Sequence, residues 1–434
     1  MKGVDKRVDK LPGKIEAESK DRHSVGLVLP CLVDVQNVRR RPEQATSSVE
    51  ATRQKVGGLH YVGIFTISLP VNFVQFEPLR LFLGVGINAG RCTYCLASPN
   101  STTTEMGVLL DYLAQSFPPK SKFNVEDIPD LTGKVIVVTG GNTGIGYETI
   151  KALLPKNAKV YMASRSEDKA KVAISWLKKE TGKETHFLQV DLSDMESIRR
   201  ATDEFKSKET ELHVLFNNAG VMIPPFEKLT AQGFDLQFGT NVMGPYLFTK
   251  RLLPLLLKGS QSSSDHKARI VNTSSSAQMF TNTIDLAAAK DGPARTQAGN
   301  GKLYMYSKFV SMPVHELEYA YSYHEYQGIV VLSNEFARRY GEQGIVSTSL
   351  NPGNLKTDLQ RDTPKIFMLL FGWLFSPAPY GALTQLWAGV SPDTADMNGK
   401  YLIPWARVGK TRPETTDPKI GAELWKFLET ETQE

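Results

Sequence analysis

A phenol and an ammonium lie four positions apart at Tyr304 and Lys308. On a helix, residues i and i+4 share one face, so these two side chains are close enough to interact. A phenol with an ordinary pKa of about 10 is a poor base at neutral pH, but a neighbouring ammonium favours the phenolate. Such a tyrosine can exchange the proton of an alcohol while a hydride moves to or from a nicotinamide cofactor. Because chance places many such pairs on helix surfaces, the pair alone does not identify a site.

Three serines lie upstream of this pair, in the run Ile270-Val-Asn-Thr-Ser-Ser-Ser276 that ends an expected strand. A serine-rich strand end is often only a loop. At the carboxyl edge of a central parallel strand, however, it lies where such sheets bind their ligands. One of the three hydroxyls can therefore hold a substrate oxygen beside Tyr304.

A glycine-rich turn, Thr139-Gly-Gly-Asn-Thr-Gly-Ile-Gly146, joins an expected strand to an expected helix. This is the context that a dinucleotide-binding turn requires. We expect Gly140 to permit the tight turn, Gly144 to let the backbone approach a pyrophosphate, and Gly146 to let the helix pack against the strand. The helix N-terminus then offers free N–H groups and a partial positive charge to the phosphates.

The choice of cofactor is indicated after the next expected strand, which ends in Ala163-Ser164-Arg165. An acidic residue there would bind the ribose 2′-hydroxyl of NAD, and none is present. Arg165 can instead bind the 2′-phosphate of NADP through its planar guanidinium. The sequence therefore favours NADP over NAD, with an ordinary surface arginine as the alternative.

The elements that must position these residues follow a regular pattern. Short apolar, β-branched runs recur along the chain, with longer segments of helical period between most of them. This alternation predicts an α/β fold: a single domain with a Rossmann-type, doubly wound parallel sheet and helices on both faces. The expected strands are 135–139, 159–163, 186–190, 214–217, 269–273, 345–350 and 400–403.

Taken together, these motifs make residues 130–405 resemble the short-chain dehydrogenase/reductase family. The matching motifs occur in the family's order: Thr139–Gly146, Asp191-Leu192, Asn217-Asn-Ala-Gly220, Asn241, Ser275, Tyr304 with Lys308, and Pro352-Gly353 with Thr357. The resemblance implies an NAD(P)-dependent enzyme that interconverts a carbonyl and an alcohol by hydride transfer, with Tyr304 as the acid/base.

The resemblance also implies the catalytic roles. Ser275 matches the second serine of the family's Asn-x-Ser-Ser, with Ser274 as the alternative. Asn241 would orient a water relay to Lys308. Lys308 would grip the nicotinamide ribose and lower the pKa of Tyr304.

For the cofactor, the resemblance implies that Asp191 holds the adenine and that Asn218 holds the adenine-ribose region and the central sheet. Pro352 and Thr357 would line the nicotinamide pocket. No metal ligand is expected. The full set of expected cofactor-binding residues is Gly140, Asn142, Thr143, Gly144, Ile145, Gly146, Arg165, Asp191, Leu192, Asn218, Ala219, Gly220, Tyr304, Lys308, Pro352, Gly353 and Thr357.

Two features are most similar to one branch of the family, the retinol dehydrogenases and WW-domain oxidoreductases. They are the 29-position interval from Ser275 to Tyr304 and the run Asn241-Val-Met-Gly-Pro-Tyr246. Members of that branch often use NADP. No WW module is visible in this sequence.

The chain departs from the family's pattern just after Lys308. The family continues as one long helix, whereas here Pro313 and a tyrosine-rich stretch interrupt the pattern until Gly328. A proline in a helix interior costs about 3 kcal/mol or more. Removing residues 310–327 restores the helical period in register, so we expect this segment to be a retained intron. The alternative is a genuine insertion, which would put activity and oligomeric state in doubt.

The chain has 434 residues, 51 of them Lys or Arg and 46 Asp or Glu, and it is 41% hydrophobic. This composition excludes collagen-like, mostly disordered and disulfide-scaffold classes. The first 105 residues hold 14 basic residues, 10 acidic residues and all three cysteines, without a regular pattern. We therefore expect a poorly patterned extension over 1–105, translated from upstream of a native start at Met106, and the family domain over 106–434.

Within that extension, Cys92 and Cys95 have the spacing of a redox or half-zinc motif but no partner pair, so coincidence is the better explanation. The apolar stretch 57–76 carries Pro70, Asn72 and Gln75, which argues against a membrane-spanning helix.

The substrate region should follow Pro352. The apolar run Lys365–Phe375 and an apolar helix through Trp387 suit a lid over a lipophilic carbonyl or alcohol, such as a retinoid, steroid or polyketide-like compound. Packing on the core and contact with a membrane surface are the alternatives. We expect no nucleic-acid partner, a monomer or homodimer, and a cytoplasmic protein with membrane association left open. Two other functions remain: a catalytically impaired nucleotide-binding regulator with the same fold, and a non-redox epimerase or dehydratase.

Overall fold

The computed structural model describes residues 110–276, 286–299, 328–357 and 375–434, together with short strands between residues 51 and 87. The chain divides into two compact units, Met1–Pro99 and Asn100–Glu434. In the first unit, two small antiparallel sheets are formed by β1 (Ala51–Thr52) with β4 (Ile64–Phe65), and by β2 (Lys55–Val56), β3 (Leu59–Tyr61) and β5 (Gly86–Ile87). All elements below belong to the second unit.

Eight strands form the main sheet, in the order β15-β14-β11-β10-β9-β6-β7-β8. All neighbouring pairs are parallel except β14 with β15. Each of the seven predicted strands is confirmed to within one residue at each end. The strands are β6 (Val135–Thr139), β7 (Lys159–Ser164), β8 (His186–Gln189), β9 (Val214–Asn217), β10 (Ala268–Thr273), β11 (Ile345–Leu350), β14 (Tyr401–Ile403) and β15 (Arg407–Val408).

Strand β6 shows why the sheet is buried on both faces. Successive side chains of a strand point to opposite faces, so its apolar residues supply two cores. Val135 and Val137 pack into the core on one face, whereas Ile136 and Val138 pack into the core on the other. A continuous apolar run of this kind is typical of parallel sheets that helices cover on both sides.

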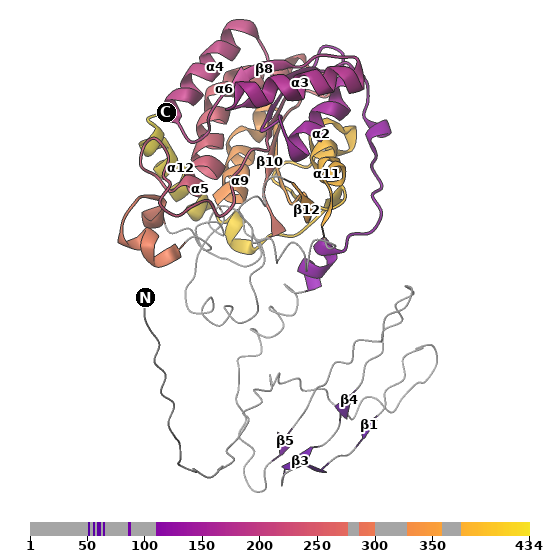
Figure 1. Ribbon diagram of the computed structural model, residues 1–434, viewed down its shortest axis with the longest axis vertical. Coiled ribbons are helices and arrows are strands. Elements are labelled where there is room, and N and C mark those ends of the chain that lie inside the picture. Colours follow the sequence, from indigo (N-terminus) through magenta and orange to yellow (C-terminus); the bar gives the residue numbers. More distant parts are fainter. Residues whose placement is uncertain are drawn as a thin grey trace, which may run out of the picture. The chain divides into compact units, whose positions relative to one another are not determined.

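Two groups of helices cover these faces, as Figure 1 shows, and the predicted doubly wound α/β fold is confirmed. On one face lie α4 (Met195–Lys208), α6 (Gly244–Ser262), α9 (Gly328–Tyr340) and α12 (Pro418–Thr432). On the other lie α2 (Gly144–Leu153), α3 (Glu167–Thr181) and α11 (Ala378–Val390). Immediately before α6 come α5 (Leu236–Phe238) and a π-helix, η4 (Gly239–Met243).

The remaining elements are short. Strand β12 (Leu355–Lys356) pairs in parallel with β13 (Ser376–Pro377), and short α-helical segments of about two turns lie at 110–116 and 293–299. The 3₁₀ helices are η2 (Val125–Asp127), η3 (Leu154–Lys156), η6 (Leu286–Ala289), η8 (Gly341–Gln343), η11 (Pro392–Thr394) and η12 (Pro413–Thr416).

Helix α11 supports one of the alternatives that the sequence leaves open. Its apolar composition suits a substrate lid, core packing or membrane contact, and in the structure the helix is a core element that packs on the sheet beside α2. Gly389 approaches the sheet so closely that a Cβ atom there would lie 2.6 Å from Cε1 of Phe216 and closer still to Cζ of the same ring. A helix that is apolar nearly all round is typically buried, and here burial against the sheet explains the composition. The run 358–374, which precedes α11, lies outside the described residues.

Across the described residues, no helix combines the length and the apolar composition that crossing a bilayer would require.

Candidate functional site

Apart from Asn241, which lies in η4, the predicted site residues that the structure describes lie at or just beyond the carboxyl ends of β6 to β11. Because these strands are parallel, their carboxyl ends meet at one edge of the sheet. The chain runs outward from β6 to β7 and β8, then returns to β9 on the other side of β6. Ligands of such sheets bind where the strand order reverses, and the glycine-rich turn after β6 lies at this point.

The glycine-rich turn has the conformation that its sequence predicts. Gly140 and Gly144 have φ angles of +67° and +55°, the left-handed region that favours glycine. A Cβ atom on Gly146 would lie 2.7 Å from Nδ2 of Asn218 and 2.9 Å from the carbonyl carbon of Gly140. Gly146 therefore lets helix α2 approach the turn itself, a closer contact than the predicted packing against the strand.

Thr139 links this turn to the loop after β9. Its hydroxyl donates to the carbonyl of Phe216 (3.1 Å) and accepts from the backbone N–H groups of Asn218 (2.9 Å) and Ala219 (3.0 Å). The amide of Asn218 in turn donates to the Thr139 carbonyl (2.8 Å). Asn218 thus connects the ends of β6 and β9, and Ala219 and Gly220 follow it in the loop.

The other three predicted cofactor-binding residues of the turn differ in exposure. Thr143 is exposed and Asn142 is half-buried at the N-terminal end of α2. Ile145 is also half-buried, and it lies against Gly381 of α11, where a Cβ atom would be 3.2 Å from its Cγ1. The polar residues thus remain near the free N–H groups of the helix, while Ile145 fixes the turn to the core.

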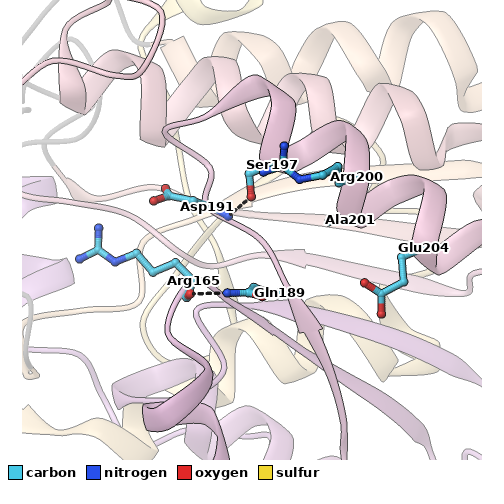
Figure 2. A pocket seen from close by; sticks show the side chains of 7 residues that line it. All are labelled: Arg165, Gln189, Asp191, Ser197, Arg200, Ala201 and Glu204. Atoms are coloured by element: carbon cyan, nitrogen blue, oxygen red, sulfur yellow. Dashed lines mark hydrogen bonds between the residues drawn. The ribbon is translucent and has the colours of Figure 1, made fainter.

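A pocket of about 420 Å³ lies at the ends of β7 and β8, beside helix α4. Figure 2 shows Arg165 and Asp191, two of the predicted cofactor residues, among the side chains that line it. Arg165 is exposed, and its carbonyl accepts a hydrogen bond from Gln189 (3.4 Å). Arg200 lines the same pocket from α4 and forms an ion pair with Asp194 (3.8 Å).

Asp191 shapes the turn after β8. Its Oδ1 accepts from the backbone N–H (2.9 Å) and the hydroxyl (2.7 Å) of Ser193, while its own N–H donates to Ser197 (2.9 Å). Leu192 packs its side chain into the core, next to Gly244 at the start of α6. Asp191 therefore faces the pocket, whereas Leu192 contributes chiefly to packing.

Asn241 lies fully buried in the π-helix η4. Its Oδ1 accepts from the N–H of Val221 (2.9 Å) and its Nδ2 donates to the carbonyl of Val221 (3.0 Å). A π-helix is rare, and single turns of it occur frequently at functional sites. The asparagine side chain thus holds the loop that follows Gly220.

Among the three serines after β10, Ser275 is half-buried, whereas Ser274 and Ser276 are 5% and 8% exposed. The carbonyl of Ser275 accepts a hydrogen bond from the hydroxyl of Tyr401 (2.9 Å). Ser275 is therefore the more exposed of the two candidate serines.

The loop after β11 lies beside the glycine-rich turn. Gly353 has a φ of +93°, and a Cβ atom there would lie 3.1 Å from the ring of Trp405. Its N–H donates to Oδ1 of Asn351 (3.0 Å), next to Pro352. Thr357 lies 3.5 Å from the Cβ position of Gly144. The structure therefore brings the loop from Pro352 to Thr357 beside the N-terminus of α2, although they are far apart in sequence.

Tyr304 and Lys308 lie outside the described residues, as do the 310–327 segment, Met106, Cys92 and Cys95. Another phenol near the site, Tyr246 of α6, is fully buried among Phe336 and Trp425. Burial raises the pKa of Tyr246, so it stays neutral and serves in packing.

Three residues important to this edge were not predicted as site residues. Thr139 lies inside the glycine motif. A hydroxyl at the end of a buried strand could have indicated a residue that binds the neighbouring strand ends. Gln115 accepts from Asn351 (2.9 Å) and ties helix 110–116 to the loop after β11, and no local pattern indicates such a long-range pair. Gln237 accepts from the N–H of Ile223 (2.9 Å), again with no local signal.

Comparison with known proteins gives three findings. The family model described as short chain dehydrogenase matches residues 134–292. A short-chain dehydrogenase/reductase of Armillaria gallica is 52% identical over 329 residues, covering 76% of this chain and 100% of the relative, and one of Phomopsis amygdali is 38% identical over 315 residues, covering 69% and 87%. The crystal structure of an uncharacterized protein from Mycobacterium paratuberculosis is similar with a TM-score of 0.50 and 25% identity, covering 72% of this chain and 98% of that one.

Proposed function

This chain belongs to the short-chain dehydrogenase/reductase family of NAD(P)-dependent oxidoreductases, and we propose that it uses NADP to interconvert a carbonyl and an alcohol on a lipophilic small molecule. Tyr304 would exchange the substrate proton, Ser275 would hold the substrate oxygen, and Lys308 would bind the nicotinamide ribose. Bound NADPH would supply the hydride.

The observation that carries the choice of NADP is the joint position of Arg165 and Asp191 at one pocket (Figure 2). Asp191 follows β8 and would bind the adenine. The guanidinium of Arg165 follows the neighbouring strand, β7, and so lies in the region where the adenosine ribose would lie. A charge-assisted, bidentate contact with a phosphate is geometrically well suited to arginine. The residue directly after Ser164, where an acidic side chain would bind a 2′-hydroxyl, is Arg165.

The substrate class and branch rest on sequence features. We place the protein near the retinol dehydrogenases and WW-domain oxidoreductases because of the run Asn241–Tyr246 and the long interval to Tyr304. The apolar run 365–375 suits a lipophilic substrate. We propose in addition that the protein makes peripheral contact with a membrane and is a monomer or homodimer.

We also propose that the native catalytic domain spans 106–434 and lacks residues 310–327. Sequencing of the transcript tests this proposal, and a message that retains the codons for 310–327 throughout would refute it.

The decisive experiment compares NADPH and NADH binding in the wild type and Arg165→Gln. A hydrogen bond to a charged group is worth about 1.5–3 kcal/mol, so the Kd for NADPH should rise about 10- to 150-fold. The Kd for NADH should stay within about twofold, because NADH carries no 2′-phosphate. Isothermal titration calorimetry measures both.

Arg200→Gln is the matched control, because Arg200 lines the same pocket but is paired with Asp194. A loss of NADPH affinity equal to that of Arg165→Gln would show that general positive charge, and not Arg165, selects the cofactor.

A third variant, Tyr304→Phe, tests catalysis separately from cofactor binding. It should bind NADPH normally and reduce none of a panel of lipophilic aldehydes and ketones that the wild type reduces. NADPH binding by the wild type without any turnover would favour the regulatory alternative.

A further inference from the structure

The loop Val221–Phe226, which follows Gly220 at the carboxyl end of β9, is held at three separate points. Val221 is bound through both backbone groups by the side chain of Asn241 (2.9 and 3.0 Å). Ile223 donates its N–H to Oε1 of Gln237 (2.9 Å). At the far end, the carbonyl of Phe226 accepts from the guanidinium of Arg295. Three buried side chains therefore fix one loop of six residues.

The loop is also strained. Ile223 has a φ of +44°, although it is β-branched and precedes Pro224. For such a residue a positive φ is a true outlier, costing about 1–3 kcal/mol, and it persists only where the surroundings enforce it. Strain of this kind clusters at functional sites. The hydrogen bond that the Ile223 N–H donates to Oε1 of Gln237 enforces this conformation.

Arg295 joins the loop to the helix that carries Asn241. Its side chain is 3% exposed, and its Nε lies 3.2 Å from Oδ2 of Asp235, which is 2% exposed. The other carboxylate oxygen of Asp235 accepts the N–H groups of Gln237 and Phe238 (both 3.0 Å) and so begins α5, which leads into η4. The guanidinium of Arg295 thus binds both Phe226, at the end of the 221–226 loop, and Asp235, the N-cap residue of α5.

The same arginine anchors a second chain segment. Arg295 lies in the helical segment 293–299, nine residues before Tyr304 in the sequence. Its guanidinium stacks on the ring of Phe226 at 4.0 Å. In addition, Asp235 donates its N–H to the carbonyl of Ala289 (2.8 Å). The segment that leads toward Tyr304 is therefore fastened to the loop that follows Gly220.

We propose that Arg295 is a positioning residue of the active centre: through Asp235 and Phe226 it holds the strained 221–226 loop in one conformation, as a fixed wall on the substrate side of the cofactor site. The inference rests on the proposed reductase function. Such a role gives the buried pair a function beyond stability, because replacing both partners of a buried ion pair by apolar residues is often neutral for stability. Pre-organised geometry matters for rate, since a displacement of about 1 Å can cost about 100-fold.

The test uses two variants of the full chain. Arg295→Lys keeps a positive charge opposite Asp235 but lacks the planar fork that reaches both Asp235 and Phe226. Ile223→Gly leaves the ion pair intact and removes the strain, because glycine adopts positive φ readily. For each we would measure Tm, the Kd for NADPH, kcat and KM separately with a carbonyl substrate, and amide hydrogen exchange of a peptide spanning 217–230.

We expect both variants to lower kcat about 10- to 100-fold, to leave the Kd for NADPH within about threefold, and to speed exchange in the 217–230 peptide. Ile223→Gly should do so with an equal or higher Tm, a combination that a purely structural role does not produce. Unchanged kcat and exchange in Ile223→Gly would overturn the proposal, as would an Arg295→Lys variant that loses only Tm. If the wild type reduces no carbonyl, the proposed function fails, and the exchange data alone decide whether Arg295 holds the loop.

Discussion

Gly146 offers a sharp test of how the glycine-rich turn is built. In Gly146→Ala, the new Cβ atom would lie 2.7 Å from Nδ2 of Asn218 and 2.9 Å from the carbonyl carbon of Gly140, closer than real Cβ contacts allow. Both neighbours are fixed, since Gly140 is backbone and the Asn218 amide is bound to the Thr139 carbonyl (2.8 Å). The turn or the first turn of α2 must therefore shift.

Overpacking of this kind costs about 1–3 kcal/mol. The strain falls on the turn that we propose binds the pyrophosphate, and a shift of the turn would misplace the N–H groups of α2. If the whole cost appears in binding, the Kd for NADPH should rise about 5- to 150-fold, at about 1.4 kcal/mol for each factor of ten. Any part of the cost that falls on the unliganded protein should lower Tm instead, because the link to Asn218 weakens.

Gly141→Ala is the matched control in the same turn. Its Cβ atom would lie 2.5 Å from Cδ1 of Ile150, the far end of a side chain that can rotate away, and 3.2 Å from the Val138 carbonyl oxygen. We expect the Kd for NADPH to stay within about threefold, less than ~0.7 kcal/mol. Calorimetric titration of both variants decides the matter. Equal affinities of Gly146→Ala and wild type, or equal losses in both variants, would refute the steric reasoning.

Two further predictions concern the scaffold behind the site. Thr139→Val leaves the N–H groups of Asn218 and Ala219 without their acceptor, each at a cost of about 1–3 kcal/mol. Tm and the affinity for NADPH should therefore both fall. Thr139→Ser keeps the hydroxyl and should restore both if the hydroxyl is responsible. His213 is buried and accepts the N–H of Val135 at Nδ1 (3.0 Å), and burial lowers its pKa below the usual 6.5. The unfolded chain therefore binds a proton first, so stability should be fully present above about pH 6.5 and be lost as the pH falls below it. His213→Asn, which keeps an acceptor near the Nδ1 position, should flatten that part of a Tm–pH curve; an unchanged slope would show that other groups control it.

Local sequence was sufficient for the sheet and for the glycine-rich turn. Apolar runs such as Val135–Thr139 are fully buried strands, and their type follows from composition over five or six residues. The edge strand β15 escaped prediction because Arg407–Val408 is too short to show any period. For helix α11 the sequence leaves a lid and core packing as alternatives, because apolar composition does not distinguish a helix that covers substrate from one that covers a sheet.

The parts of the site that sequence did not reveal depend on contacts between distant residues. Arg295 and Asp235 are 60 positions apart, and a buried pair has the same residue types as an exposed one. Asn351 and Gln115 are 236 positions apart. The strain at Ile223 is equally invisible, since nothing in an isoleucine before a proline signals a positive φ. Such features follow from packing and not from local pattern.

The meeting of six strand ends at one edge has a consequence for how this protein resists unfolding. A ligand held by residues from β6 to β11 cannot be released by fraying of a single element without loss of contacts to the others. Its binding energy therefore adds to the stability of the whole sheet by RT ln(1 + [L]/Kd), about 2.7 kcal/mol at a ligand concentration of 100 times Kd. Cofactor supply would then regulate the lifetime of the protein against proteases as well as its turnover, because cleavage of transiently opened molecules follows their equilibrium population.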